Sequence, residues 1–278
     1  MKVRLISGMI GFILLVAVVL SPQVVLGVSV FVLAVLAMHE FYSAVSNAGY
    51  KPVGIIGYAA CLLLLWIGVI PYTGATADAF NVLAHPKYIA FGVFIVLLVL
   101  LAIIIFMHDR YNLNDISITA FGILYIVFLF SFLPLTRSLD GGSFFIWLIF
   151  IGAWVTDTFA YFTGMAIGKT KLLPAISPKK TLEGSVGGII GCVLITAVYG
   201  LLINRHLNYI PFYHYLLLGA INGIVSQLGD WAASAIKRYV GIKDYGRIMP
   251  GHGGVLDRFD SILFIAPVVY FYIDFIIL

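Results

Sequence analysis

The sequence predicts an all-α fold, a polytopic bundle of membrane-spanning helices. Two observations are compositional: 62% of the 278 residues are hydrophobic while only 10% are charged, and the mean hydropathy is +1.10. The third is a pattern, because apolar runs of about 20 residues recur along the chain, and a helix of that length crosses the hydrocarbon core of a bilayer. A separate soluble domain is therefore not expected.

We expect nine spans with short connections, at residues 3–20, 26–45, 54–70, 88–107, 117–136, 144–167, 184–203, 213–238 and 259–277. The first span follows two basic residues, as the apolar core of a signal peptide does. However, Ser21-Pro22-Gln23 is not a cleavage site of small residues and another span follows at once, so we interpret the first span as a retained helix. An eight-span count that drops or merges this helix would leave the later loops on the same sides.

Lysine and arginine are distributed unevenly between the two sides that nine spans create. Thirteen of the sixteen fall on the side of the N-terminus, and the other side carries Lys87, Arg137 and Arg205. Because loops rich in these residues stay in the cytosol, we expect a cytosolic N-terminus and an external C-terminus. The net charge of +4 is explained by this distribution, so no nucleic-acid partner is expected.

Five carboxylates lie within the predicted spans or at their cytosolic ends, where burial in hydrocarbon is costly. In chain order they are Glu40 at the end of the second span, Asp157 in the sixth, Asp230 in the eighth, and Asp257 and Asp260 at the start of the ninth. With a rise of about 1.5 Å per residue, Asp157 lies roughly 16 Å and Asp230 roughly 10 Å from the cytosolic ends of their spans. This common depth indicates one polar site that is reached from the cytosol.

The last span begins with a pattern that suits a metal ion. Asp257 and Asp260 are one helical turn apart, and Asp230 of the eighth span is expected at a similar depth. Carboxylates arranged in this way are the hard oxygen ligands that Mg²⁺ prefers, and the ion can then bridge to substrate phosphates. A simpler interpretation also stays open, in which Asp257 caps the helix and pairs with Arg258.

The eighth span ends in a polar face, because Asp230, Ser234 and either Lys237 or Arg238 follow one another at intervals of three or four residues. Asp157 has a structural alternative to a role in this site, since its carboxylate could hydrogen-bond the neighbouring side chains of Thr156, Thr158 or Tyr161.

Two loops carry glycine, lysine and hydroxyl groups suited to phosphate. Gly251-His252-Gly253-Gly254 precedes the last span, where exposed backbone N–H groups and a helix N-terminus attract anions. Taken alone, this run is explained equally well by a tight turn after Pro250. The composition of the loop between the sixth and seventh spans favours a phosphate-binding role. The loop contains Lys169, Lys171, Ser177, Lys179, Lys180 and Thr181. Cytosolic topology alone accounts for some of these lysines.

Thirteen positions with fixed spacing extend over the twenty-seven residues from 234 to 260: Ser234, Lys237, Arg238, Lys243, Asp244, Gly246, Pro250, His252, Gly253, Gly254, Asp257, Arg258 and Asp260. Together they resemble the signature of the phosphatidate cytidylyltransferase family, also called CDP-diacylglycerol synthases. The resemblance continues at Asp157, Ala160, Tyr161, Gly164, Gly168, Lys169, Ser177-Pro178-Lys179-Lys180-Thr181, Glu183, Gly184, Gly187 and Gly188. Two segments resemble the family's N-terminal half more loosely, Glu40-Phe41-Tyr42 and Gly49-Tyr50-Lys51-Pro52.

This resemblance implies a metal-dependent nucleotidyltransferase that transfers the cytidylyl group of CTP to phosphatidic acid, giving CDP-diacylglycerol and pyrophosphate. It implies Mg²⁺ as the cofactor, with room for a second cation, and CTP, phosphatidic acid and the lipid bilayer as partners; a homodimer is allowed. We expect one integral domain over residues 1–278 in the inner (plasma) membrane, with N-terminal spans in 1–140 and catalytic spans in 141–278. The active site is expected to face the cytosol.

The resemblance also assigns roles to the signature residues. The metal ligands would be Asp257 and Asp230, assisted by Asp260 and Asp157. The expected catalytic residues are Asp257, Asp230, Lys237, Arg238, Arg258 and His252, the last of these donating to a phosphate oxygen. The expected substrate-binding residues are Ser177, Lys179, Lys180, Thr181, Ser234, Lys243, Asp244, Arg247, Gly253 and Gly254. Catalysis would rest on positioning and charge neutralisation, because the attacking phosphate is already anionic.

Intramembrane aspartates also occur in two other classes of membrane protein. A transporter or channel would use Asp157 and Asp230 as a cation path, but no internal repeat is present and the basic and glycine-rich segments all lie on one side. A CDP-alcohol phosphotransferase would need several aspartates in a DG…AR…G…D…D pattern. Asp140-Gly141 lacks the downstream residues and is expected on the opposite side of the membrane.

Overall fold

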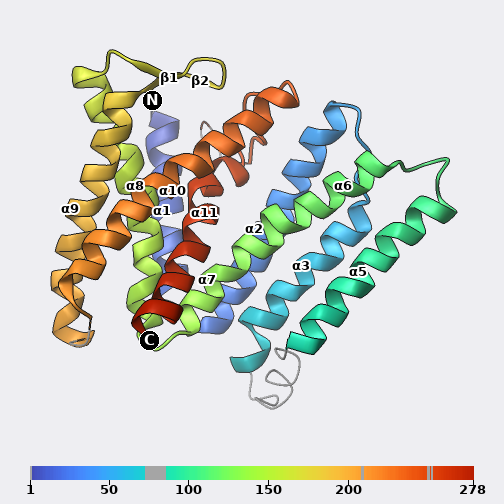
Figure 1. Cartoon of the computed structure of the whole chain (residues 1–278), viewed down its shortest axis with the longest axis horizontal. Coiled ribbons are helices and arrows are strands. Elements are labelled where there is room, and N and C mark those ends of the chain that lie inside the picture. Colours follow the sequence, from blue (N-terminus) through green and yellow to red (C-terminus); the bar gives the residue numbers. More distant parts are fainter. Residues whose placement is uncertain (1, 73–85, 208–209, 249–250, 252) are drawn as a thin grey trace. The chain divides into compact units, whose positions relative to one another are not determined.

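The computed structural model describes residues 2–72, 86–207, 210–248, 251 and 253–278. Within these residues the chain forms nine long helical segments and one short hairpin of two strands (Figure 1). The segments are α1 (Lys2–Leu20), α2 (Gln23–Asn47), α3 (Gly54–Gly68), α5 (Pro86–Phe106), the continuous helix of α6 (Leu113–Gly122), η2 (Ile123–Phe128) and α7 (Leu129–Ser138), then α8 (Gly142–Ile167), α9 (Leu182–Leu207), α10 (Phe212–Tyr239), and α11 (Leu256–Tyr272) with its extension η3 (Ile273–Ile277). A single 3₁₀ turn, η1 (Ile70–Tyr72), follows α3.

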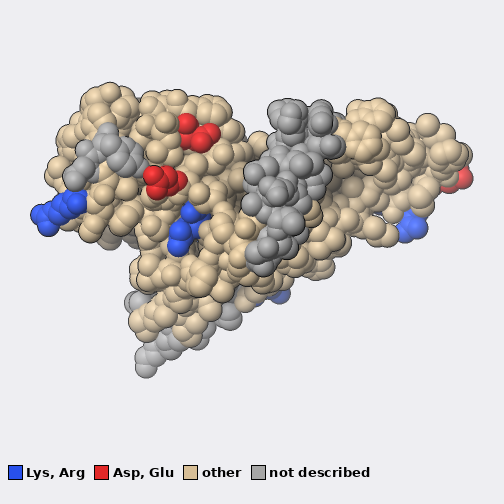
Figure 2. Space-filling model, turned by 90° about the horizontal axis from the view of Figure 1, so that it is seen from below, with Lys and Arg blue, Asp and Glu red and all other residues tan. Residues whose placement is uncertain are grey.

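Five of these segments are long and apolar enough to cross a membrane: Gln23–Asn47, Leu113–Ser138, Gly142–Ile167, Leu182–Leu207 and Leu256–Ile277. Three shorter apolar helices accompany them, at Ser7–Leu20, Gly54–Gly68 and Phe91–Phe106. Uncharged residues cover most of the face shown in Figure 2, where charged side chains form a few separate spots. The predicted all-α, polytopic membrane fold is confirmed at this level.

The lysine-rich loop after α8 has a structure that the sequence analysis did not predict. Strand β1 (Lys171–Leu173) pairs antiparallel with β2 (Ser177–Thr181), with Lys171 opposite Thr181 and Leu173 opposite Ser177. The turn between the strands is closed by the Ile176 N–H, which donates to the Leu173 carbonyl oxygen at 3.1 Å. Leu173 and Ile176 are half-buried, so apolar contacts as well as the ladder hold this hairpin.

The chain divides into two compact units, which are described separately. Unit 1 comprises residues 1–20 and 135–278, and unit 2 comprises residues 21–134. All predicted metal ligands lie in unit 1. The predicted single integral domain, with its subdivision at residue 140, stays a prediction.

In unit 1, glycine allows α9 to approach its two neighbours closely. A Cβ atom at Gly188 would lie 2.9 Å from the carbonyl oxygen of Thr156 on α8, and one at Gly223 of α10 would lie 2.9 Å from the Cα of Ile189 on α9. Small residues at such positions let helix backbones pack against each other inside a membrane. Asp157 directly follows Thr156, so this contact fixes the height of Asp157 against α9.

Helices α10 and α11 are joined at the depth of their aspartates. The Ser261 hydroxyl donates to the carbonyl oxygen of Ser226 at 3.0 Å. A Cβ atom at Gly229 would lie 2.7 Å from the carbonyl oxygen of Asp260. Asp230 and Asp260 therefore stand on neighbouring helices beside the closest approach of the two backbones.

In unit 2, helix α6 begins with a capping box that also anchors the α2–α3 loop. The Asn112 side chain accepts from the Asp115 N–H at 3.0 Å, and the Asp115 carboxylate accepts from the Asn112 N–H at 3.0 Å. The other Asp115 oxygen accepts from the Lys51 N–H at 2.6 Å. The loop that turns the chain from α2 into α3 is thereby held against α6.

Candidate active site

Three carboxylates from three different helices gather in unit 1. Asp157 comes from α8, Asp230 from α10 and Asp260 from α11, and they lie close enough to one another to interact electrostatically. The basic groups of Lys180 and Arg258 interact with Asp157 in the same way. Three of the five carboxylates that were expected at one depth thus lie close to one another, while Glu40 belongs to unit 2. The depth itself stays a prediction.

Lys180 of strand β2 is the direct partner of Asp230. Its ammonium group forms an ion pair with the Asp230 carboxylate and lies 5.8 Å from the centre of the Trp231 ring, within the range of a cation–π contact. The Ser234 hydroxyl donates to the other Asp230 oxygen at 3.4 Å. This ion pair holds the β1–β2 hairpin, which we call the lysine hairpin, against α10 at the carboxylate cluster. The Lys180 and Asp230 side chains are about a third and a quarter exposed.

Asp257 is surrounded by hydrogen-bond donors. One oxygen accepts from the Lys237 ammonium at 2.7 Å, and the other accepts from the N–H groups of Tyr245 and Gly254 at 2.8 and 3.0 Å. The alternative in which Asp257 pairs with Arg258 is not what the structure shows, because the partner is Lys237 at the end of α10. Asp257 therefore ties the end of α10, the following loop and the start of α11 together.

The glycine-rich turn before α11 is shaped around this carboxylate. Gly253 has a φ of 90°, a conformation that residues with a side chain rarely adopt. A Cβ atom at this position would also lie 2.9 Å from an Asp257 oxygen. Tight turning and close approach thus explain Gly253, while a phosphate-binding role for Gly253 and Gly254 stays a prediction. Pro250 and His252 lie outside the described residues.

Tyr245 was not singled out by the sequence analysis, although it lies inside the signature run. Its side chain is buried, and the Lys237 ammonium lies 5.4 Å from the centre of its ring. Burial, with the added effect of the Asp257 and Asp260 charges, raises the pKa of the Tyr245 hydroxyl. The hydroxyl therefore stays protonated at neutral pH and donates to the Ala233 carbonyl oxygen at 3.3 Å.

Arg238 links the β1–β2 hairpin to the loop between α10 and α11 (residues 240–255), which we call the signature loop. Its Nε donates to the carbonyl oxygen of Ile176 at 3.4 Å, and its Nη1 donates to that of Ile242 at 3.1 Å. Four other basic or acidic residues with predicted substrate roles are exposed: Lys179, Lys243, Asp244 and Arg247. Arg258 is exposed as well, whereas the Lys237 side chain is buried.

Thr181 and Glu183 accept backbone hydrogen bonds where the β1–β2 hairpin leads into α9. The Thr181 hydroxyl is buried and accepts from the Gly184 N–H at 3.2 Å, as a helix cap does. The Glu183 carboxylate accepts from the N–H groups of Lys169 and Thr170 at 3.1 to 3.2 Å. These contacts hold the hairpin's two ends, and Ser177 lies in β2 between them and the turn.

The donor chemistry of the cluster suits a divalent cation. Carboxylate oxygens are the ligands that Mg²⁺ prefers, and one oxygen of Asp230 currently neutralises an ammonium group that a cation would replace. Within the part of the chain that the structure describes, no three histidine, cysteine, aspartate or glutamate side chains converge on a preformed metal site. The four predicted ligands thus fit Mg²⁺ by chemistry, and their role stays a prediction.

Comparisons with known proteins cover the whole chain. Residues 2–276 match the profile of the cytidylyltransferase family. A phosphatidate cytidylyltransferase of Staphylococcus epidermidis is 32% identical over 276 residues, covering 97% of both chains, and one of Bacillus subtilis is 32% identical over 274 residues, covering 98% of this chain and 97% of its own. A phosphatidate cytidylyltransferase of Thermotoga maritima is 45% identical over 159 residues, covering 55% of this chain and 58% of its own.

Proposed function

The chain belongs to the cytidylyltransferase family, and on this premise we propose that it is a phosphatidate cytidylyltransferase. It transfers the cytidylyl group of CTP to phosphatidic acid, which gives CDP-diacylglycerol and pyrophosphate. The observation that supports this best is the junction of three carboxylates with the lysine hairpin and the signature loop in unit 1. Similarity to enzymes over the full length leaves the transporter interpretation without support.

The reaction requires little of the protein beyond binding and charge neutralisation. A phosphate oxygen of phosphatidic acid attacks the α-phosphorus of CTP in line, a new P–O bond forms, and the bond to the β-phosphate oxygen breaks so that pyrophosphate leaves. No proton has to be removed from the nucleophile, since the phosphate is already ionised. The catalytic problem is therefore to hold two polyanions together.

The basic residues of unit 1 would neutralise these anions. Lys180 of the hairpin and the exposed Arg258 of α11 would approach the phosphates directly, and the exposed Lys179 would add positive charge near them. Lys237 would act mainly by fixing the loop, because its ammonium is buried against Asp257. A divalent cation held by Asp230, Asp260 and Asp157 would supply the remaining positive charge. Asp257 would act by positioning the start of α11, because its carboxylate already accepts three hydrogen bonds.

The activity is tested by incubating purified protein with labelled CTP, phosphatidic acid and Mg²⁺ and measuring label in the chloroform phase. Asp230→Asn should lower the rate by roughly 10²-fold or more, as expected for losing a group that stabilises charge in the transition state. Asp140→Asn is the matched control, because it removes the same charge from an exposed loop at the other end of α8.

The outcomes separate the reaction from the residue. No lipid-linked label from folded parent protein would remove the proposed function. Parent-like activity of Asp230→Asn would leave the reaction standing and would remove Asp230 from the site.

The orientation is also proposed: nine spans, a cytosolic N-terminus and an active site that faces the cytosol from the inner (plasma) membrane. Its support is the excess of Lys and Arg on one side of the predicted spans. The exposed Lys179 of the hairpin provides the test. In a functional Lys179→Cys variant, a membrane-impermeant thiol reagent should label this position only after the cytosolic side is made accessible. Labelling of intact cells would reverse the orientation.

A further inference from the structure

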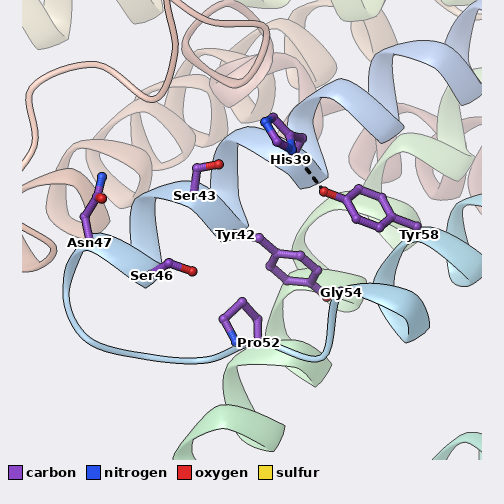
Figure 3. A pocket seen from close by; sticks show the side chains of 8 residues that line it. All are labelled: His39, Tyr42, Ser43, Ser46, Asn47, Pro52, Gly54 and Tyr58. Carbon is purple, nitrogen blue, oxygen red and sulfur yellow. Dashed lines mark hydrogen bonds between the residues drawn. The ribbon is translucent and has the colours of Figure 1, made fainter.

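A polar cavity in unit 2 is lined by none of the residues that are assigned to the reaction. Helix α2 carries His39, Ser43, Ser46 and Asn47 at intervals that place them on one face of its last turns. They line a cavity of about 430 Å³ together with Tyr42, Pro52, Gly54 and Tyr58. Figure 3 shows this stripe of side chains above the loop that leads into α3.

The cavity lies at the end of membrane-spanning helices. Helix α2, one of the candidate spans, ends at Asn47, and α3 begins at Gly54. The intervening loop exposes the Lys51 side chain. An opening at such a level faces the boundary between the apolar and aqueous phases, where lipid headgroups lie.

The walls of the cavity are held in place before any ligand binds. The Lys51 N–H donates to Asp115 at 2.6 Å, and the Val53 N–H donates to the Thr119 hydroxyl at 2.8 Å, which fixes the loop beside Pro52. On the opposite wall the His39 ring and the Tyr58 hydroxyl are hydrogen-bonded at 3.1 Å. A ligand would therefore meet a largely preorganised site.

The lining groups are suited to an acceptor-rich ligand. Hydroxyl, amide and imidazole groups line the cavity, and none of the eight lining residues is a carboxylate. The Ser43, Ser46 and Asn47 side chains are exposed, so a ligand can reach them. The site therefore offers several donors to a ligand that carries acceptors.

We propose that this cavity binds the phosphate ester headgroup of a glycerophospholipid. Phosphate oxygens would accept hydrogen bonds from Ser43, Ser46 and Asn47, with the exposed Lys51 at the rim adding favourable charge. The acyl chains would remain against the apolar surface of the helices. A volume of about 430 Å³ accommodates a headgroup, since small-molecule sites usually enclose roughly 300–1,000 Å³.

The test measures binding without CTP, so it does not depend on the proposed reaction. Purified, delipidated full-length protein is titrated with phosphatidylglycerol and examined by native mass spectrometry, with diacylglycerol as the lipid that lacks phosphate. The parent should retain phosphatidylglycerol in preference to diacylglycerol. His39→Ala with Ser43→Ala should weaken retention roughly tenfold, because the Ser43 hydrogen bond to phosphate is lost together with the His39–Tyr58 contact that holds the wall.

Ser29→Ala is the matched control, since Ser29 lies on the same helix, outside the cavity, and donates within α2 to the carbonyl oxygen of Val25. Ser46→Ala with Asn47→Ala is a second, independent variant, and all four lining side chains that the two variants change are exposed, so the fold should survive.

A soluble competitor distinguishes two sources of the phosphate ester. If glycerol 3-phosphate displaces the lipid at comparable concentration, the cavity recognises a free phosphate ester; if it does not, the acyl chains contribute and the ligand is a lipid. Equal retention of diacylglycerol and phosphatidylglycerol by the parent would overturn the proposal. So would parent-like retention in both double variants.

Discussion

Unit 1 contains two lysine–aspartate pairs that look alike in the sequence and differ in their surroundings. In the Lys237–Asp257 pair the side chains are 11% and 2% exposed and the ions are 2.7 Å apart. In the Lys180–Asp230 pair the side chains are 31% and 24% exposed. Asp257 of the first pair also accepts from two backbone N–H groups, whereas Asp230 of the second pair also accepts from the Ser234 hydroxyl.

This difference in exposure indicates that one pair stabilises the structure of the site and the other takes part in binding. A buried pair with additional backbone donors is costly to break, because the remaining charge has no water to solvate it. A partly exposed pair contributes little to stability and can exchange its partners for substrate or cation. We infer that Lys237–Asp257 shapes the loop on which the site is built, while Lys180–Asp230 is the pair that opens when anions and a cation arrive.

Replacement of the buried aspartate should have the largest effect. Asp257→Asn leaves the Lys237 ammonium buried without a counter-ion. It also replaces one carboxylate oxygen by an NH2 donor, which opposes either Lys237 or the N–H donors of Tyr245 and Gly254. The loss should be about 3–5 kcal/mol of unfolding free energy. It should appear as a lower unfolding temperature of the purified protein, with activity lost in parallel.

The double variant Lys237→Met with Asp257→Asn is the control for charge burial, because no unpaired ammonium remains. It should recover part of the thermal stability without recovering activity. If Asp257→Asn instead unfolds at the temperature of the parent and is still inactive, the Asp257 carboxylate acts directly on metal or substrate. The distinction between the two pairs would then fail.

The helices were predictable because a membrane imposes a length on them. The sixth span was predicted at residues 144–167, and the structure has α8, one of the candidate spans, at Gly142–Ile167. The β1–β2 hairpin was not predicted, because its strands are only three and five residues long. It depends on contacts such as those of Glu183 with Lys169 and Thr170, and no periodic pattern in a single segment reports them.

The composition of the candidate site was predictable from the sequence, whereas the pairing of its side chains was not. Asp157, Asp230 and Asp260 were expected together because topology brings them to one level, and the structure places them within electrostatic range. The partner of each aspartate depends on tertiary distances, since Lys180 is 50 residues from Asp230 in the chain.

Unit 2 contains a similar case. Asn112 and Asp115 have the spacing of a capping box, which the sequence displays. However, the sequence does not reveal that Asp115 also holds the Lys51 N–H, from a position 64 residues away. The local sequence therefore identifies the start of α6. The contact that shapes the α2–α3 loop forms only when distant parts of the chain fold together.

Removal of the exposed lysine should have a smaller effect, and a different one. Lys180→Met deletes the ammonium that pairs with Asp230 and lies near the Trp231 ring, while the methionine side chain keeps much of the apolar contact. Because the pair is partly exposed, unfolding free energy should change by only about 0–1 kcal/mol. The KM for CTP should rise by roughly tenfold, since one charge-assisted contact to phosphate is lost.

Lys179→Met sharpens this prediction, because it removes the same charge from the adjacent, exposed position of β2. Both variants remove one positive charge near the site. A general electrostatic effect on CTP binding would therefore raise the KM for CTP equally in both variants, and this increase would become smaller at high salt. A contact specific to Lys180 would raise KM in that variant alone. Steady-state kinetics at low and high salt, with unfolding temperatures measured in parallel, decide between them. An unfolding temperature that falls for Lys180→Met as far as for Asp257→Asn would show that the exposed pair also builds the fold.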